Sequence, residues 1–228
     1  MAPARGVWVR DSPAAPALTM RQMLVSLAVV ALIGAVHAQS VSERAQAILN
    51  RAITDFEGGR FGESAAAFDS LTRIVPEYAP QLWQRGIALY FAGRYNDCRA
   101  QFELHRTVNP NDVENAAWHF LCVARADSLE RARIALLPVG PDARVPMRQI
   151  YLMFQGGLTP EAVMAAAGDQ PAAQFYAQLY IGLYSEGAGK QDLALEHIRA
   201  AAADRYAAGG GYMHMVARAH LAVLQRRP

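Results

Sequence analysis

The sequence predicts an all-α protein built from pairs of short helices, and three observations lead to this prediction. Between residues 45 and 56, apolar side chains recur at the spacing of one helical face. Gly58 and Gly59 then end this stretch, as glycines commonly end helices. No segment shows the apolar–polar alternation that is typical of a half-buried strand. The chain has 228 residues, 53% hydrophobic and 18% charged, which suits one domain with a buried core.

Part of this pattern occurs twice along the chain, with an offset of 34 residues between the two copies. Such a period, with aromatic residues and a closing Pro, is the signature of the tetratricopeptide repeat, a helix–turn–helix unit. One unit cannot bury its apolar face alone, so we expect a solenoid of stacked tetratricopeptide repeats. The matched positions are Gly59 and Gly93, Arg60 and Arg94, Phe61 and Tyr95, Phe68 and Phe102, and Pro76 and Pro110.

The same pattern and its interruptions divide residues 39–228, which we expect to form one tetratricopeptide-like domain. Ser42 is expected to cap the first helix, and Asn111, with Glu114 three residues later, to cap a helix further on. Gly86 is expected where two helices approach closely, and Gly209–Gly211 to form a hinge. The predicted segments are repeats at about 45–78, 79–112 and 175–208, a degenerate repeat at 113–137, an insertion at 138–174 and a capping helix at 212–226.

Residues 20–38 are predicted to be a cleavable secretory signal. An uncharged apolar run at 23–36 follows Arg21 and is shorter than the roughly 20 residues that span a bilayer. It leads into Ala38, where Val-His-Ala forms a cleavage site of the A-x-A type. We therefore expect a periplasmic protein, with anchoring by an uncleaved signal as the alternative. Residues 1–19 are interpreted as an extension upstream of the natural start at Met20.

The charges of the chain are balanced once its N-terminal part is set aside. Of the 22 Lys and Arg and the 20 Asp and Glu, three Arg and one Asp lie within residues 1–38. The rest of the chain therefore has no excess of basic residues for nucleic acid, and none is expected as a partner. Cys98 and Cys122 lie in predicted helices and are interpreted as small buried side chains. A disulfide between them, formed after export, is the alternative.

The order of segments over residues 79–202 resembles one particular family. A repeat ending in RTVNPND is followed by a Trp-bearing helix, the insertion IYLMFQGGLTPEAVM and the stretch FYAQLYIGLYSEGAGKQDLALEHI. This order looks like that of the NlpI-type bacterial envelope lipoproteins. The resemblance implies an exported helical adaptor that brings peptidoglycan hydrolases together with other envelope proteins, including a protease, and that can form a homodimer. The chain lacks that family's lipid-attachment Cys, so tethering to the membrane by a lipid is not expected.

Residues capable of catalysis or metal binding do not assemble into a recognisable motif. His119 and Cys122 are three residues apart, but no further ligands follow at a spacing that would complete a zinc site. The stretch 186–190 contains Gly and Lys but lacks the spacing and the Ser or Thr of a phosphate-binding loop. Neither a G-x-S-x-G nor an H-E-x-x-H motif is present. We therefore expect no enzyme activity, no metal and no cofactor.

The first helices of stacked repeats are expected to line a concave groove. In the helix at 82–91, the stripe that includes Leu82, Gly86 and Leu89 is assigned to the partner helix, which turns Trp83 and Tyr90 toward the groove. Exposed aromatic side chains are common anchors in protein interfaces. The predicted partner-binding residues are Leu49, Trp83, Ile87, Tyr90, Phe91, Glu114 and Leu121. The alternative is that a neighbouring helix or a second subunit covers this stripe.

These observations predict a non-enzymatic scaffold of the bacterial envelope that binds a partner protein or peptide in an aromatic groove. Two alternatives of other classes remain open at this point. One is an envelope enzyme with an unrecognised His/Asp site, and the other is a self-associating structural protein.

Overall fold

The computed structural model describes the backbone of residues 20–226 and the side chains of residues 39–226. The regular elements of this described part are helices, with no strand among them, so the all-α prediction is confirmed. The predicted extension at 1–19 lies outside the described residues, and so do the side chains of the predicted signal at 20–38. Where side chains are described, no helix is both long enough and apolar enough to cross a membrane.

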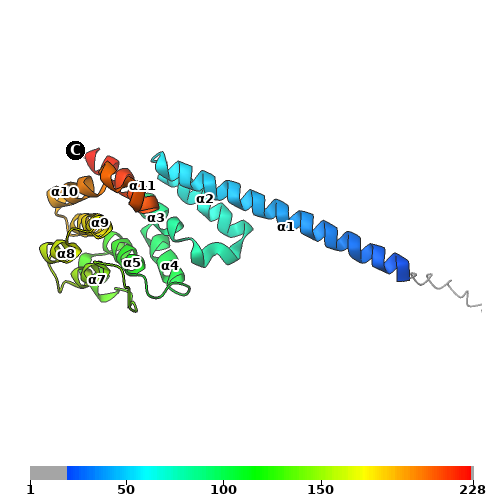
Figure 1. The fold of residues 1–228 in the computed structure, drawn as a ribbon, viewed down its shortest axis with the longest axis horizontal. Helices are drawn as coiled ribbons and strands as arrows, with labels where there is room; N and C mark the ends of the chain where they lie inside the picture. The colour runs from blue at the N-terminus through cyan, green and yellow to red at the C-terminus, as the bar shows by residue number, and fades with distance from the viewer. Residues whose placement is uncertain (1–19, 227–228) are drawn as a thin grey trace, which may run out of the picture. The chain divides into compact units, whose positions relative to one another are not determined.

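Helix α1 (Met20–Glu57) crosses the boundary between two compact units, Met1–Glu43 and Arg44–Pro228. The second unit contains all the other helices (Figure 1). The predicted start of the first helix at Ser42 is wrong, because α1 passes through this residue without a break. Neither Gly nor Pro occurs between residues 35 and 57, so nothing in that segment stops a helix.

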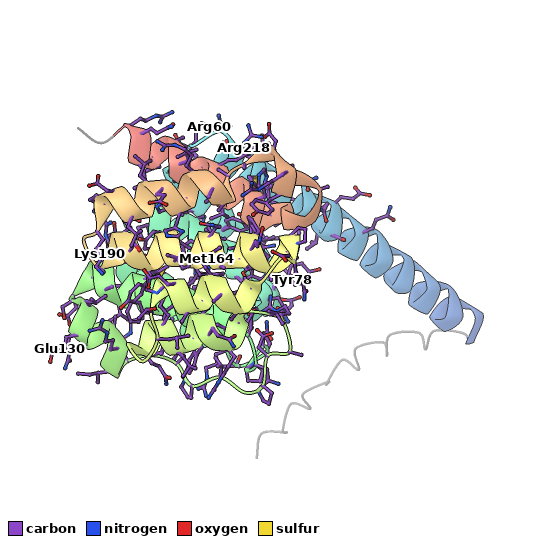
Figure 2. All side chains as sticks on the ribbon, turned by 60° about the vertical axis from the view of Figure 1, so that its left-hand side comes forward. Arg60, Tyr78, Glu130, Met164, Lys190 and Arg218 are labelled. Atoms are coloured by element: carbon purple, nitrogen blue, oxygen red, sulfur yellow. A yellow bond between two sulfur atoms is a disulfide. The ribbon has the colours of Figure 1, made fainter. Side chains whose placement is uncertain are left out.

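Most helices of the second unit pack against the helix that precedes or follows them in the chain. Neighbouring pairs include α2 with α3, α3 with α4, α4 with α5 and α9 with α10, while α7 and α8 of the insertion lie against α9. Figure 2 shows α9 and α10 side by side, with Lys190 at the turn between them. The elements after α1 are α2 (Phe61–Ile74), the 3-10 helix η1 (Pro76–Gln81), α3 (Trp83–Phe91), α4 (Tyr95–His105), α5 (Val113–Ala126), α6 (Leu129–Ile134), α7 (Met147–Gln155), α8 (Pro160–Ala167), α9 (Pro171–Gly187), α10 (Gln191–Ala201), the 3-10 helix η2 (Asp204–Tyr206) and α11 (Ala207–Gln225).

Three of the turns between paired helices have the same backbone geometry. Gly59, Gly93 and Gly189 have φ values of 72°, 74° and 75°, in the left-handed region that favours glycine. In each turn the residue after the glycine donates its N–H to a carbonyl five residues earlier, at 2.8, 2.9 and 2.8 Å. The predicted glycine turns are therefore confirmed at these three positions.

Two further glycines allow paired helices to approach closely. A Cβ atom at Gly86 of α3 would lie 2.6 Å from the ring of Phe102 in α4. At Gly182 of α9 it would lie 2.7 Å from Ile198 in α10. Both contacted side chains are buried, so neither can move away freely. The prediction that Gly86 stands at a close helix approach is thus confirmed.

A disulfide joins Cys98 of α4 to Cys122 of α5, with 5.9 Å between their Cα atoms. The interpretation of these residues as unpaired small side chains was therefore wrong, although both are fully buried. The helical pattern placed each cysteine on the inner face of its helix but could not show that the two faces meet. A cross-link over 24 residues stabilises a fold by about 3 kcal/mol, mainly by restricting the unfolded chain.

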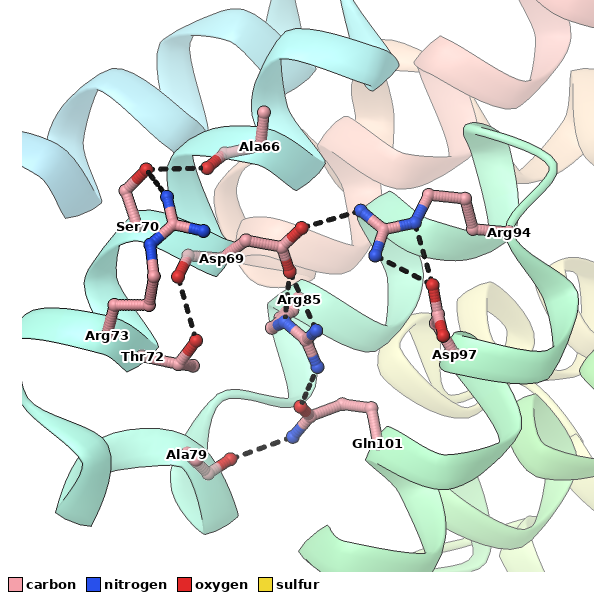
Figure 3. Close-up of polar contacts among 10 residues, drawn as sticks. All are labelled: Ala66, Asp69, Ser70, Thr72, Arg73, Ala79, Arg85, Arg94, Asp97 and Gln101. Atoms are coloured by element: carbon pink, nitrogen blue, oxygen red, sulfur yellow. Dashed lines mark hydrogen bonds and ion pairs between the residues drawn. The ribbon is translucent and has the colours of Figure 1, made fainter.

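A polar network around Asp69 of α2 ties three helices together (Figure 3). Its carboxylate pairs with Arg85 of α3 at 2.7 Å and with Arg94 at 2.6 Å. Arg85 also donates to Gln101 of α4, and Gln101 donates to the carbonyl of Ala79, at 2.7 and 2.8 Å. Burial alone would raise the pKa of Asp69, but the hydrogen bonds from the two arginines lower it. The network thus holds α2, α3 and α4 in register.

Two details of the helix ends differ from expectation. Asp112 caps α5, because its carboxylate accepts the N–H of Glu114 at 3.0 Å, whereas the expected cap was Asn111. Gly211 interrupts α11 with φ 49° and ψ −133°, so the predicted hinge is a kink within a helix that begins earlier, at Ala207. Thr159 caps α8, because its side chain accepts the N–H of Ala162 at 3.3 Å.

Gly86→Ala tests the close packing of α3 on α4. The added Cβ would overlap the Phe102 ring, and we expect the free energy of unfolding to fall by about 1–3 kcal/mol. Gly62→Ala on the exposed face of α2 is the matched control, since no described atom lies within 4 Å of its added Cβ. That change should raise stability by about 0.5 kcal/mol through helix propensity. Equal midpoints for both variants in urea denaturation would contradict the close approach.

Candidate functional site

The C-terminal helix α11 covers the side of α3 on which the sequence predicts an open groove. The ring of Tyr212 lies 5.0 Å from that of Trp83, at an angle of 81°. Further along α11, the ring of His220 lies 5.3 Å from that of Phe91. Figure 1 shows α11 next to α3. The protein therefore fills much of the expected groove with its own final helix.

This arrangement corrects part of the predicted binding surface. Ile87 and Leu121 are fully buried and Tyr90 is 5% exposed, so these three side chains belong to the core and offer no surface to a partner. Tyr90 packs edge-on against Trp118 at 5.5 Å. Helical spacing had assigned them to an open face, but neighbouring helices cover these side chains in the folded protein.

The other four predicted residues are half-buried, and the structure brings only two of them together. Leu49 lies on α1, and Phe91 packs between Phe56 of α1 and His220 of α11. Trp83 and Glu114, in contrast, line the same cavity. The candidate site is therefore smaller than the predicted groove and lies at one end of it.

The cavity has a volume of about 410 Å³ and lies between α3, α4, α5, α9 and the start of α11. Its wall on the α11 side is formed by Gly209–Gly211, whose lack of side chains leaves room. The kink at Gly211 then turns the chain so that Tyr212 faces Trp83. The aromatic side chains that line the cavity are Trp83, Phe102, Trp118, Tyr176 and Tyr212.

Three buried polar atoms on residues that line this cavity have no hydrogen-bond partner among the described residues. They are the Oδ1 atom of Asn115, the indole N–H of Trp118 and the hydroxyl of Tyr212. The amide of Asn115 is oriented by its Nδ2 atom, which donates to the carbonyl of Phe102 at 3.2 Å. Unpaired polar atoms are rare inside proteins, since each costs about 1–3 kcal/mol of stability. These three atoms make the cavity a candidate binding site.

The hydrogen-bonding character of these three atoms determines which groups of a ligand could pair with them. Asn115 Oδ1 accepts a hydrogen bond, the Trp118 indole donates one, and the Tyr212 hydroxyl can do either. Asn115 and Trp118 are 3% and 1% exposed, so their polar atoms gain little from bulk water. A group that offers both an N–H and a carbonyl, such as a peptide unit, matches this set.

A carboxylate cluster borders the same cavity. Glu114 accepts a hydrogen bond from the hydroxyl of Tyr180 at 2.6 Å, and both Glu114 and Asp112 pair with Arg144. Burial raises the pKa of Glu114, and the neighbouring Asp112 adds to this rise against the effects of Tyr180 and Arg144. Burial and the charge of Glu114 likewise keep the pKa of Tyr180 well above its usual value, so Tyr180 remains a donor.

The cavity lacks the side chains that nucleophilic catalysis usually needs. No Ser, Thr, Cys or Lys is present among the described residues that line it. Its one histidine, His105, is held by a contact of 2.8 Å between Nδ1 and the carbonyl of Pro80. Across the described part of the chain, no group of three or more His, Cys, Asp or Glu residues is placed to hold a metal ion.

Sequence reasoning missed most residues of the cavity, Trp118 among them, although two of the missed residues left a signal. Asn115 is a polar residue in the otherwise apolar inner stripe of α5, and Tyr212 is a bulky residue directly after three glycines. Tyr176 gave no such signal, because it stands among other aromatic residues of α9. No protein-family model matches the chain.

Tyr212→Phe tests whether the Tyr212 hydroxyl is unpaired. We expect the free energy of unfolding to stay unchanged or to rise by up to about 1 kcal/mol, because the change removes a buried polar atom without a partner. Tyr180→Phe is the matched control and should lower stability by about 1–3 kcal/mol, because it removes the hydrogen bond to Glu114. Both are measured by urea denaturation. Equal losses for the two variants would mean that the Tyr212 hydroxyl is paired in the folded protein.

Proposed function

We propose that this chain is a non-enzymatic binding module of the tetratricopeptide type that holds a peptide segment of a partner protein in the cavity beside α11. The observation that carries this proposal is the set of unpaired polar atoms on Asn115, Trp118 and Tyr212 within an aromatic enclosure. These unpaired atoms lower the stability of the free protein, and a bound peptide would remove this penalty by forming hydrogen bonds with them.

The peptide backbone supplies the complementary groups. Its N–H would donate to Asn115 Oδ1, and its carbonyl would accept from the Trp118 indole. The rings of Trp83 and Tyr212 would then pack on the side chain that the peptide inserts. The volume of about 410 Å³ lies in the range of about 300–1,000 Å³ that is usual for ligand pockets, which suits a short segment.

Several features support the repeat assignment and the absence of catalysis. The 34-residue sequence period coincides with two turns of the same geometry, at Gly59 and Gly93. Stacked helix pairs of this type commonly present concave surfaces to partners. Among the described residues, the lining has no nucleophilic Ser, Thr, Cys or Lys, which favours binding over an enzymatic role.

Export to the periplasm is part of the proposal. The apolar segment at 20–38 supports it, and so does the disulfide between Cys98 and Cys122, because disulfides persist mainly in oxidising compartments. The resemblance to envelope adaptors suggests partners among peptidoglycan hydrolases or envelope proteases. A homodimer is compatible with the same role.

Selection of peptides on the full chain tests this function. A phage-displayed library of random peptides is panned on the protein, and the dissociation constants of enriched peptides are measured by calorimetry. We expect Trp118→Phe to weaken binding about tenfold. The change removes the hydrogen bond to the peptide carbonyl and leaves that carbonyl unpaired, which costs about 1.4 kcal/mol of binding free energy.

The matched control is Tyr151→Phe, which removes a hydroxyl that bonds to the carbonyl of Leu137 away from the cavity. This variant should bind as the unchanged protein does. The proposal is wrong if no peptide is enriched, or if Trp118→Phe folds normally and binds the enriched peptides with unchanged affinity.

A further inference from the structure

The charges that border the cavity are mainly negative. Asp112 and Glu114 line it, and no Lys or Arg is found among its described lining residues. His105 also lines it, but its Nδ1 atom is engaged with the carbonyl of Pro80. The guanidinium of Arg144 pairs with both carboxyl groups.

Arg144 does not neutralise this cluster, because it is shared among three carboxyl groups. It pairs with Asp112 and Asp142 at 2.7 Å each, and also with Glu114. Burial alone would raise the pKa of Asp142, but hydrogen bonds from Arg144 lower it and keep Asp142 ionised. Even with Glu114 protonated, two carboxylates face one guanidinium, so an excess of negative charge remains.

The aromatic walls of the cavity also favour a cation. Aromatic faces carry partial negative charge and attract cations that lie within about 6 Å of the ring centre. The structure already contains one such contact, because the guanidinium of Arg144 lies 5.9 Å from the ring centre of Tyr176. Trp83 and Tyr212 form two adjoining walls whose planes meet at 81°. These rings could surround a second cation.

We propose that the cavity selects a peptide segment carrying a basic side chain, with the Lys or Arg head group placed between the aromatic walls and the carboxylates of Asp112 and Glu114. This inference rests on the proposed function and adds the charge of the partner segment to it. The unpaired, buried polar atoms of Asn115 and Trp118 hold the peptide backbone, and the acidic edge selects the side chain.

Synthetic peptides of one design test the charge preference on the full chain. The probes are acetyl-Gly-Gly-X-Gly-Gly-amide, in which X is Lys, norleucine or Glu, and calorimetry at low salt measures each dissociation constant. We expect the Lys peptide to bind about tenfold more tightly than the norleucine peptide, and the Glu peptide to bind most weakly. Raising the salt concentration should reduce the preference for Lys, because salt screens the exposed charges.

Asp112→Asn identifies the source of the preference. Asn retains the ability to cap α5 but removes the charge, so the ratio between the Lys and norleucine peptides should fall several-fold. Asp127→Asn is the matched control, since Asp127 is an exposed acid at the other end of α5. It should leave the ratio unchanged.

The possible results separate the two proposals. If all three peptides bind equally and Trp118→Phe weakens all of them, the cavity binds peptides without selecting charge, and this inference is wrong. If none of the peptides binds, both proposals are wrong. If free butylammonium binds as tightly as the Lys peptide, the site recognises amines rather than a peptide segment, which also contradicts the inference.

Discussion

The packing of α11 against α3 is the constraint on which the rest of the site depends. This packing includes two ring contacts, one between Tyr212 and Trp83 and one between His220 and Phe91. Helix α11 also packs on α10 and α9, and Nε2 of His220 lies 2.9 Å from a carboxylate oxygen of Glu186 in α9. These contacts hold α11 in position. Its presence turns what would be an open groove into a partly covered cavity.

The cover that α11 provides explains why the unpaired polar atoms of Asn115 and Trp118 matter. In an open groove, the indole of Trp118 and the amide of Asn115 would face water, and water would form their hydrogen bonds. Under α11 both side chains are nearly inaccessible, so their polar atoms reduce stability unless a ligand completes them. Proteins retain such unfavourable features mainly at sites of function. The proposed peptide binding follows from this argument rather than from a motif.

The surrounding helices are joined so that the cavity walls stay in place. The disulfide between Cys98 and Cys122 fixes α5, which carries Asn115 and Trp118, to α4. The network around Asp69 fixes α2 and α3 to α4. A preformed cavity loses less free energy on binding than one that must first be ordered. The cross-links therefore contribute to the proposed function as well as to the stability of the fold.

The sequence by itself determined the helices, the glycine turns and the close approach at Gly86, because each depends on residues that are near in the chain or on backbone conformations only glycine adopts readily. It also named Trp83 and Glu114, which line the same cavity. Only the tertiary structure decided that Ile87, Tyr90 and Leu121 belong to the core and that α11 covers the predicted groove. Helical periodicity shows which residues share a face, but it does not show which distant element packs on that face. The cavity joins residues 83, 115, 176 and 212, and their meeting depends on that long-range packing.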